Sequence, residues 1–285
     1  MVSAHAAPLR PASSACTRGS GAATTASRLG QPDLAIATMN DFVDAGRMHA
    51  SINPSVPVIA DADTGFGGPI NVARTVTQYI RAGLAGCHIE DQVQTKRCGH
   101  LMGKQVVSRE EFIRRIRAAV IARDSVPGGS DFVIIGRTDS AQVLGMDEAV
   151  YRLKLAADAG ADVCFIEGVK TAELLKKTVA ALAPKPVLVN VISGGLTPSF
   201  TCQEAEQFGA KLIIYAADQR ITVFSLVSCV AMLHGVRAAM RSLKKTGTDW
   251  TSAQGMDPKA FFEVMGLQEV TTLDARAGGN AFDEV

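Results

Sequence analysis

The stretch PVIADADTGFGG, residues 57–68, combines a short apolar run with two carboxylates and a glycine-rich loop. The apolar run Val56–Ala60, which begins one residue before this stretch, is typical of a strand that is covered on both faces. Asp61 and Asp63 follow at the point where this strand ends. A buried strand that ends in polar residues and glycine, before a segment with helical periodicity, begins a βα unit.

The same order recurs along the rest of the chain, and six apolar runs alternate with longer segments of helical character. We expect strands over Val56–Ala60, Gly86–Glu90, Asp131–Gly136, Asp162–Glu167, Pro186–Val191 and Lys211–Ala216. We expect helices over Ile70–Ala82, Arg109–Arg123, Met146–Ala159, Ala172–Leu182, Cys202–Phe208, Phe224–Lys245 and Asp257–Met265. This alternation predicts an α/β fold built on a parallel sheet.

Composition excludes several classes of function. The 285 residues are 47% apolar and 20% charged, with a formal net charge of +1, so the chain can bury a large core but has no basic excess for nucleic acid. The sequence contains no uninterrupted apolar stretch of about 18 residues, so it predicts no membrane span. The six cysteines form no CxxC pair, which favours reduced thiols in the cytoplasm. Residues 1–19 contain no acid, which leaves mitochondrial targeting as the alternative.

Polar side chains follow five successive predicted strands. One such residue alone is most simply a helix cap or a solvated loop residue, but the carboxyl ends of parallel strands meet at one edge, where barrel enzymes place their active sites. The residues at these positions are Asp61, Asp63, Glu90, Asp91, Arg137, Asp139, Glu167 and Asn190. The sequence therefore predicts a site at this edge.

Asp61 and Asp63 are candidates for a metal site. Magnesium is commonly held by one or two carboxylates, with water and substrate oxygens completing its shell. Glu90, at the end of the next strand, could complete or orient that shell. A calcium loop is the alternative, but its 12-residue pattern is missing here.

The segment Lys96-Arg97-Cys98-Gly99-His100 forms a second cluster. Two cations and a histidine around a thiol create the environment that lowers a cysteine pKa and allows acid, base or nucleophilic chemistry. Gly99 and Gly103 favour a loop that can close over a substrate. The alternative is a solvated basic turn that contains a cysteine by chance.

These motifs resemble one enzyme superfamily in order and spacing. PVIADADTGFGG, GCHIEDQ, TKRCGHLMGKQVVSREEF, DFVIIGRTD, ADVCFIEG and PVLVNV are similar to the isocitrate lyase and phosphoenolpyruvate mutase superfamily, over about residues 19–245. The methylisocitrate lyase, dimethylmalate lyase and oxaloacetate hydrolase branch is the most similar, because mutases lack the Cys-Gly-His loop. The resemblance implies a (β/α)8 TIM-type barrel with magnesium, or alternatively manganese, as cofactor.

The resemblance also implies roles for individual residues. Asp61, Asp63 and Glu90 would serve the metal, with Asp33 in its outer shell, and Ser20, Gly21, Ala22, Gly99, Arg137, Glu167 and Asn190 would bind the substrate. Cys98 would be the catalytic acid, with Lys96, His100 and Arg137 assisting. The last helices would join subunits of a homo-oligomer, and neither nucleic acid nor membrane is an expected partner.

The resemblance predicts a lyase that cleaves a carbon–carbon bond in a small 2-hydroxy di- or tricarboxylate. An oxaloacetate hydrolase and a phosphoenolpyruvate mutase-like enzyme are the alternatives within the superfamily. The six runs match the third to eighth strands of its barrel, so we expect an irregular or altered segment over residues 1–18, without the first one or two strands. The barrel would span 19–245 and a C-terminal helix and tail 246–285. The missing strands motivate another class of answer, an inactive partner of an intact homologue.

Overall fold

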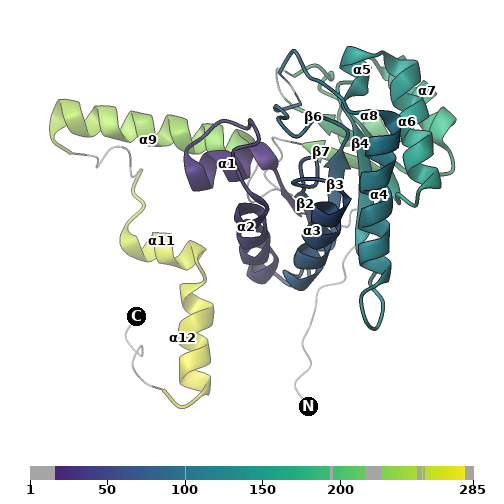
Figure 1. Cartoon of the computed structure of the whole chain (residues 1–285). Coiled ribbons are helices and arrows are strands. Elements are labelled where there is room, and N and C mark those ends of the chain that lie inside the picture. The colour runs from purple at the N-terminus through teal and green to yellow at the C-terminus, as the bar shows by residue number, and fades with distance from the viewer. Residues whose placement is uncertain are drawn as a thin grey trace. The chain divides into compact units, whose positions relative to one another are not determined.

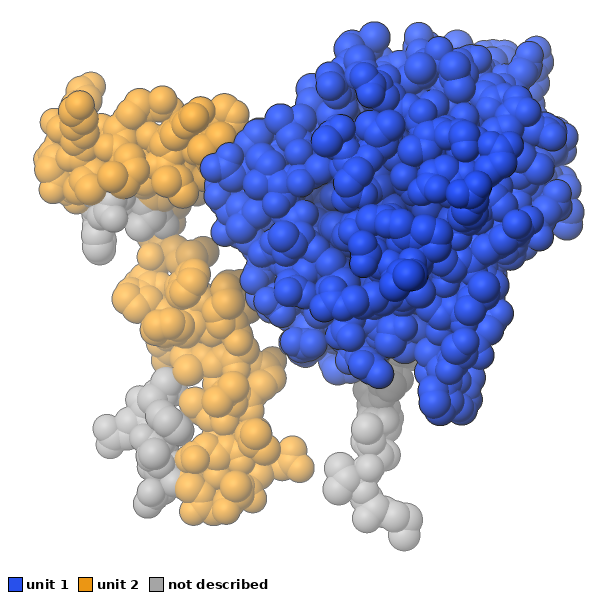
Figure 2. All heavy atoms as spheres, viewed as in Figure 1, with its two compact units in different colours: residues 1–229 blue, residues 230–285 orange. Residues whose placement is uncertain are grey.

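A computed structural model describes residues 17–99, 101–192, 195–215, 226–248, 252 and 254–279. The chain divides into two compact units, residues 1–229 and residues 230–285, coloured separately in Figure 2. The candidate site lies in the first unit.

The first unit is built on one parallel sheet. Its seven strands are hydrogen-bonded in the order in which they occur along the chain (Figure 1). They are β1 (Thr17–Gly19), β2 (Val58–Asp61), β3 (Gly86–Glu90), β4 (Val133–Thr138), β5 (Val163–Ile166), β6 (Val187–Val191) and β7 (Leu212–Tyr215). Strands that pair in sequence order, with helices between them, give the βα arrangement that the sequence predicted.

Helices connect successive strands. They are α1 (Gly21–Leu29), α2 (Met39–Ile52), α3 (Pro69–Arg81), α4 (Arg109–Asp124), α5 (Ser140–Val143), α6 (Met146–Asp158), α7 (Ala172–Leu182) and α8 (Cys202–Gln207). Side-chain hydrogen bonds to backbone N–H groups define where several helices begin. The Ser108 and Thr171 side chains cap α4 and α7, and Thr201 forms a capping box with Glu204 at α8. The bounds of α7 are those predicted from the sequence.

Side chains alternate between the two faces of the sheet along each strand, so apolar residues pack separately on each face. On β3 to β6, residues such as Ile89, Ile134 and Val189 pack toward the helices, while Ile135, Phe165 and Leu188 form a cluster on the opposite face. Because successive side chains of a strand point to opposite faces, the residues two positions after these three share their face. Those residues are Arg137, Glu167 and Asn190, so the inner core and the candidate site lie on one face of the sheet.

The first strand is a correction to the sequence prediction. Six strands were expected, beginning at Val56, yet Thr17–Gly19 pairs in parallel with Val58–Ala60 and makes a seventh. This strand carries no apolar periodicity and is defined by its backbone pairing, which a pattern of side chains does not reveal. Within the described residues no ladder joins β1 to β7, so both remain edge strands of the sheet.

The second unit contains most of α9 (Leu226–Thr246), together with α11 (Pro258–Val264) and α12 (Leu267–Arg276). The sequence predicted the first two, and it did not predict α12. Apolar side chains are exposed on all three helices, among them Met240, Phe262 and Leu273 at 58%, 52% and 64%. Among the helices that the structure describes, none is both long and apolar enough to cross a membrane.

Glu148 gives a pH-dependent test of the helix layer. It accepts hydrogen bonds from Arg109 at the start of α4 and from Arg152 on α6, and these bonds lower its pKa to about 2 from an ordinary value of 4.5. A depressed folded pKa stabilises the fold above the ordinary pKa, and this stabilisation is lost as the pH falls toward the folded value. Replacing Glu148 with Gln should therefore destabilise the protein at pH 7, and this cost should shrink as the pH falls from about 4.5 toward 2.

Urea denaturation at several pH values measures this difference in unfolding free energy. Glu206→Gln, at an exposed position on α8, is the control and should change stability little throughout. An equal cost of Glu148→Gln at pH 7 and at pH 3.5 would contradict the assignment.

Candidate active site

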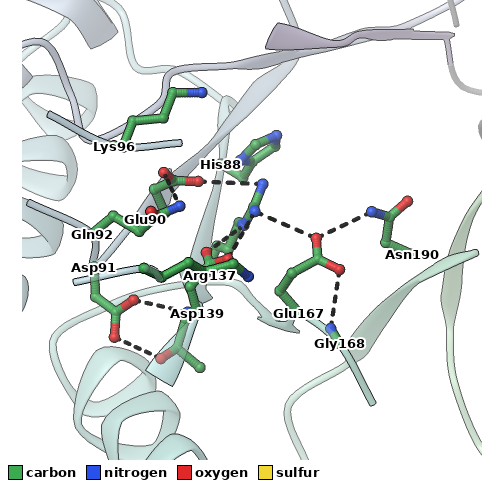
Figure 3. A network of polar contacts seen from close by, with 12 residues as sticks. His88, Glu90, Asp91, Gln92, Lys96, Arg137, Asp139, Glu167, Gly168 and Asn190 are labelled. Atoms are coloured by element: carbon green, nitrogen blue, oxygen red, sulfur yellow. Dashed lines mark hydrogen bonds and ion pairs between the residues drawn. The ribbon is translucent and has the colours of Figure 1, made fainter. Parts of the chain in front are cut away.

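Arg137 is the centre of the polar network at the carboxyl end of the sheet. Figure 3 shows its guanidinium among the carboxylates of Glu90, Asp139 and Glu167, and all four side chains are buried. Nε and Nη2 donate to the two Asp139 oxygens at 2.9 and 3.1 Å, which makes a bidentate pair. Nη1 lies 3.3 Å from Glu90 and Nη2 lies 3.4 Å from Glu167.

These carboxylates fix the charge of the arginine. Burial opposes a charged guanidinium, but the negative charges of Asp139, Glu90 and Glu167 outweigh it and raise the pKa of Arg137 well above its ordinary value. Planar nitrogen donors that remain charged are suited to bind a carboxylate of a substrate. Glu167 is itself held by the Asn190 amide at 3.1 Å and by the Gly168 N–H at 3.0 Å.

A second group of acids surrounds the end of β2. The Asp61 carboxylate accepts the backbone N–H groups of Gly21 at 2.9 Å and of Asp63 at 3.0 Å. A side chain at position 21 would collide with it, because a Cβ there would lie 2.7 Å from Asp61 Oδ2. His88 is buried, and its Nε2 lies 3.4 Å from Asp61 Oδ1.

Lys96 connects this group to the loop after α1. Its ammonium lies 2.5 Å from the Asp33 carboxylate and 2.6 Å from Asp63. Burial raises the pKa of Asp63 to about 7, with Asp61 and Asp33 adding to the shift and Lys96 opposing it. Asp63 also has a left-handed backbone, with φ of +46°, of the kind often found at functional sites.

The acids near Asp61 form a suitable environment for a hard cation. Burial raises the pKa of Glu90 above its ordinary value, as it does for Asp63, which means that negative charge here is incompletely compensated. Oxygen ligands and excess negative charge are what magnesium requires. In the part of the chain that the structure describes, no three acidic, histidine or cysteine side chains have the spacing of a complete ligand set. Magnesium is commonly bound by one or two carboxylates and several waters, which is the kind of site that Asp61 and Asp63 could provide.

Residues 94–99 and 101–104 belong to a loop that we call the lid. An antiparallel bridge between Gln92 and Val106 closes its base. Gln92 also donates to Glu90 and to the backbone oxygen of Arg97, both at 2.9 Å, so one buried amide joins the acid to the lid. The Cys98 N–H donates to the Asp33 backbone oxygen at 3.0 Å.

The lid lies directly against the arginine. A Cβ at Gly99 would overlap Arg137 Nη2 and lie 3.0 Å from Glu167 Cγ, so only glycine permits this approach. The half-buried Cys98 precedes this contact. Ser20 and Ala22, at the start of α1, are half-buried on either side of Gly21. His100 lies outside the described residues.

Comparison with known proteins identifies the family. The model of the phosphoenolpyruvate phosphomutase family matches residues 6–232. The 2,3-dimethylmalate lyase of Eubacterium barkeri is 38% identical over 259 residues, which cover 89% of this chain and 83% of that protein. This chain belongs to the phosphoenolpyruvate mutase and isocitrate lyase superfamily.

Proteins with lyase and hydrolase names are among the similar members of the superfamily. A probable 2-methylisocitrate lyase 2 of Corynebacterium glutamicum is 37% identical over 88% of this chain and 78% of its own length. A solved structure of oxaloacetate acetylhydrolase, in complex with 3,3-difluorooxalacetate, is 47% identical with a TM-score of 0.84. The superposition covers 93% of this chain and 86% of that one, so the superfamily fold extends over nearly all of this protein.

Several residues of this superfamily site had no assigned role in the sequence analysis. Gln92 and Lys104 are buried polar residues that contact Glu90 and Asp139, and both lie where the lid meets the sheet. Asp139 was expected only as a polar residue at a strand end, yet it orients Arg137. The sequence signal for Lys104 was its place after Gly103, but periodicity does not distinguish a buried lysine from a solvated one.

The lid contact can be tested with Gly99→Ala. The added methyl group must displace Arg137, Glu167 or the lid, and a displacement of about 1 Å in a site of this kind can reduce kcat/KM by about 100-fold. Steady-state kinetics measures this loss, and circular dichroism checks the fold. Gly68→Ala is the control, because a Cβ there meets nothing within 4 Å. Wild-type kcat/KM in Gly99→Ala would mean that the lid does not close on Arg137 during turnover.

Proposed function

We propose that this protein is a magnesium-dependent lyase that cleaves a carbon–carbon bond in a small 2-hydroxy di- or tricarboxylate. The products would be a 2-oxo acid and a second carboxylate, as expected for a substrate similar to methylisocitrate or a substituted malate. The observation that carries the proposal is the contact between Gly99 and Arg137, which holds Cys98 at the edge of a buried site that contains both a carboxylate-binding arginine and a group of acids.

Arg137 with its neighbours and the acids near Asp61 have different roles in the proposed reaction. Arg137 binds a substrate carboxylate, and Glu167 and Asn190 limit the space around it. Asp61 and Asp63 would hold magnesium, and Glu90 and Asp33 would orient its water shell. Bound magnesium would supply Lewis-acid stabilisation of the negative charge that develops on oxygen as the bond breaks.

Proton transfer completes the reaction. The 2-hydroxyl group loses its proton as it becomes a carbonyl, and the carbon of the departing fragment must gain one. We assign delivery of that proton to Cys98 on the lid, and Lys96 balances the charge of Asp33 and Asp63. Closing the lid keeps water from the site, which protects the carbanion-like fragment until Cys98 protonates it.

A hydrolase that converts oxaloacetate to oxalate and acetate is the second candidate. The similarity to oxaloacetate acetylhydrolase, at 47% identity and a TM-score of 0.84, favours it. Both reactions break a carbon–carbon bond next to a carboxylate and need the same arginine and cation, so the products distinguish them.

A coupled assay tests both activities through release of pyruvate, glyoxylate or oxalate, with and without magnesium. Turnover should require the metal, and Cys98→Ser should reduce kcat by about 100-fold or more, the range expected for a general acid. Cys202→Ser, at an exposed position on α8, should retain wild-type kcat. Wild-type turnover by Cys98→Ser would remove this thiol from the mechanism, and the absence of all three products would favour an inactive partner.

We also propose that the protein assembles with copies of itself through its C-terminal helices. Met232, Val236 and Met240 recur at intervals of four residues on α9, and each is more than half exposed. Side chains spaced in this way form one apolar stripe, which favours contact with another apolar surface. Phe261, Phe262 and Leu273 of α11 and α12 add exposed apolar area.

Light scattering after size exclusion tests the assembly. The wild-type mass should be a multiple of the 30.0 kDa chain, and Met240→Glu should shift it toward one chain by placing a charge in the stripe. Lys245→Glu, at an exposed position on the same helix, is the control. A wild-type protein of one chain mass would overturn this proposal and leave the proposed reaction untouched.

A further inference from the structure

Lys104 is buried although its neighbours Gly103 and Gln105 are exposed. Its side chain is 1% exposed, and Nζ lies 2.6 Å from Asp139 Oδ1. Removing a lysine charge from water is costly, and a buried ion pair seldom adds stability compared with apolar residues of the same size. The position therefore suggests that the charge of Lys104 serves the site.

The lysine stands at the base of the lid. The Val93 N–H donates to the Gln105 oxygen at 3.0 Å, and the Val107 N–H donates to the Asp91 oxygen at 2.9 Å. These bonds anchor the two ends of the lid to each other, immediately beside Lys104. A contact made by Lys104 thus fixes the point from which the lid extends toward Gly99 and Arg137.

Asp139 is the link between Lys104 and Arg137. Its carboxylate accepts two bonds from Arg137 and one from Lys104, and its backbone N–H donates to Asp91 Oδ1 at 2.8 Å. Burial alone would raise the pKa of Asp139, but the charges of Arg137 and Lys104 lower it, so this carboxyl remains ionised. Asp139, Glu90 and Glu167 all place negative charge around Arg137, and the Lys104 ammonium offsets part of it.

We propose that Lys104 is a positioning residue that acts through Asp139. It offsets negative charge around Arg137, which favours a substrate carboxylate there, and it fixes the base of the lid to the same carboxylate that orients the arginine. Binding of the substrate carboxylate and closure of the lid are coupled in this way. The first part rests on the proposed function, because it requires that Arg137 bind a carboxylate.

Oxalate, in the presence of magnesium, is the probe for the first part. Lys104→Met removes the charge and keeps the length of the side chain, and it should weaken oxalate binding in calorimetry by about tenfold or more, as losses of supporting contacts commonly do. KM should rise by a larger factor than kcat falls, and Lys104→Arg should restore part of the affinity. Lys154→Met, at an exposed position on α6, is the matched control and should bind as the wild type does.

A double variant tests whether the effect passes through Asp139. Asp139→Asn should weaken oxalate binding by itself, and adding Lys104→Met to it should cost little more, because the link is already broken. Independent effects of the two substitutions would overturn the role assigned to Asp139.

The alkylation rate of Cys98 by iodoacetamide, followed by mass spectrometry of its peptide, reports on the lid without any substrate. Lys104→Met should raise this rate by about threefold or more, because a lid with a loosened base opens more often. Should Lys104→Met fail to fold, as judged by circular dichroism, Lys104→Gln replaces it in each measurement.

The two readouts separate this inference from the proposed function. If the wild type releases no product and binds no oxalate, the proposed function fails, and the Cys98 rate alone decides whether Lys104 holds the lid. If the wild type binds oxalate, a folded Lys104→Met protein that matches Lys154→Met in affinity overturns the role toward Arg137. An unchanged Cys98 rate overturns the role in the lid.

Discussion

The buried ion pair between Arg137 and Asp139 is the interaction on which the site depends. A guanidinium inside a protein needs compensating charge, and here a bidentate carboxylate provides it at 2.9 and 3.1 Å. That pairing fixes the plane of the guanidinium, so that Nη1 lies toward Glu90 and Nη2, which also bonds Asp139, lies 3.4 Å from Glu167. The space in which a substrate carboxylate can bind is therefore set by a contact on the opposite side of the arginine.

The other half of the site is a group of acids with a lysine among them. Asp33, Asp61, Asp63 and Glu90 gather near the single ammonium of Lys96, and burial raises the pKa of Asp63 to about 7. Excess negative charge in a buried region favours a divalent cation. The arginine that we propose binds the substrate and the acids that we propose hold the metal thus lie beside each other, and the lid, which carries both Cys98 and Lys96, contacts both.

Family resemblance and geometry agree on the kind of chemistry and differ in what they explain. The similarity to lyases and to oxaloacetate acetylhydrolase identifies the superfamily, but it does not separate two reactions that share an arginine, a cation and a cysteine loop. The geometry explains why Gly99 must be glycine and why Lys104 is buried. Both are consequences of a loop that closes directly onto a charged network.

The sequence by itself determined the α/β class, six of the seven strands and the residues at the strand ends. Apolar runs that alternate with helical segments specify these features locally, since hydrophobic periodicity is a property of neighbouring residues. The bounds of Gly86–Glu90 and Ala172–Leu182 were predicted without error for this reason. Only the tertiary structure decided the pairing of Thr17–Gly19 with β2, the contact of Gly99 with Arg137, and the chain of contacts from Lys104 through Asp139 to Arg137. Each of these joins residues that are far apart in sequence or depends on burial of a charge, and a pattern of neighbouring residues records neither.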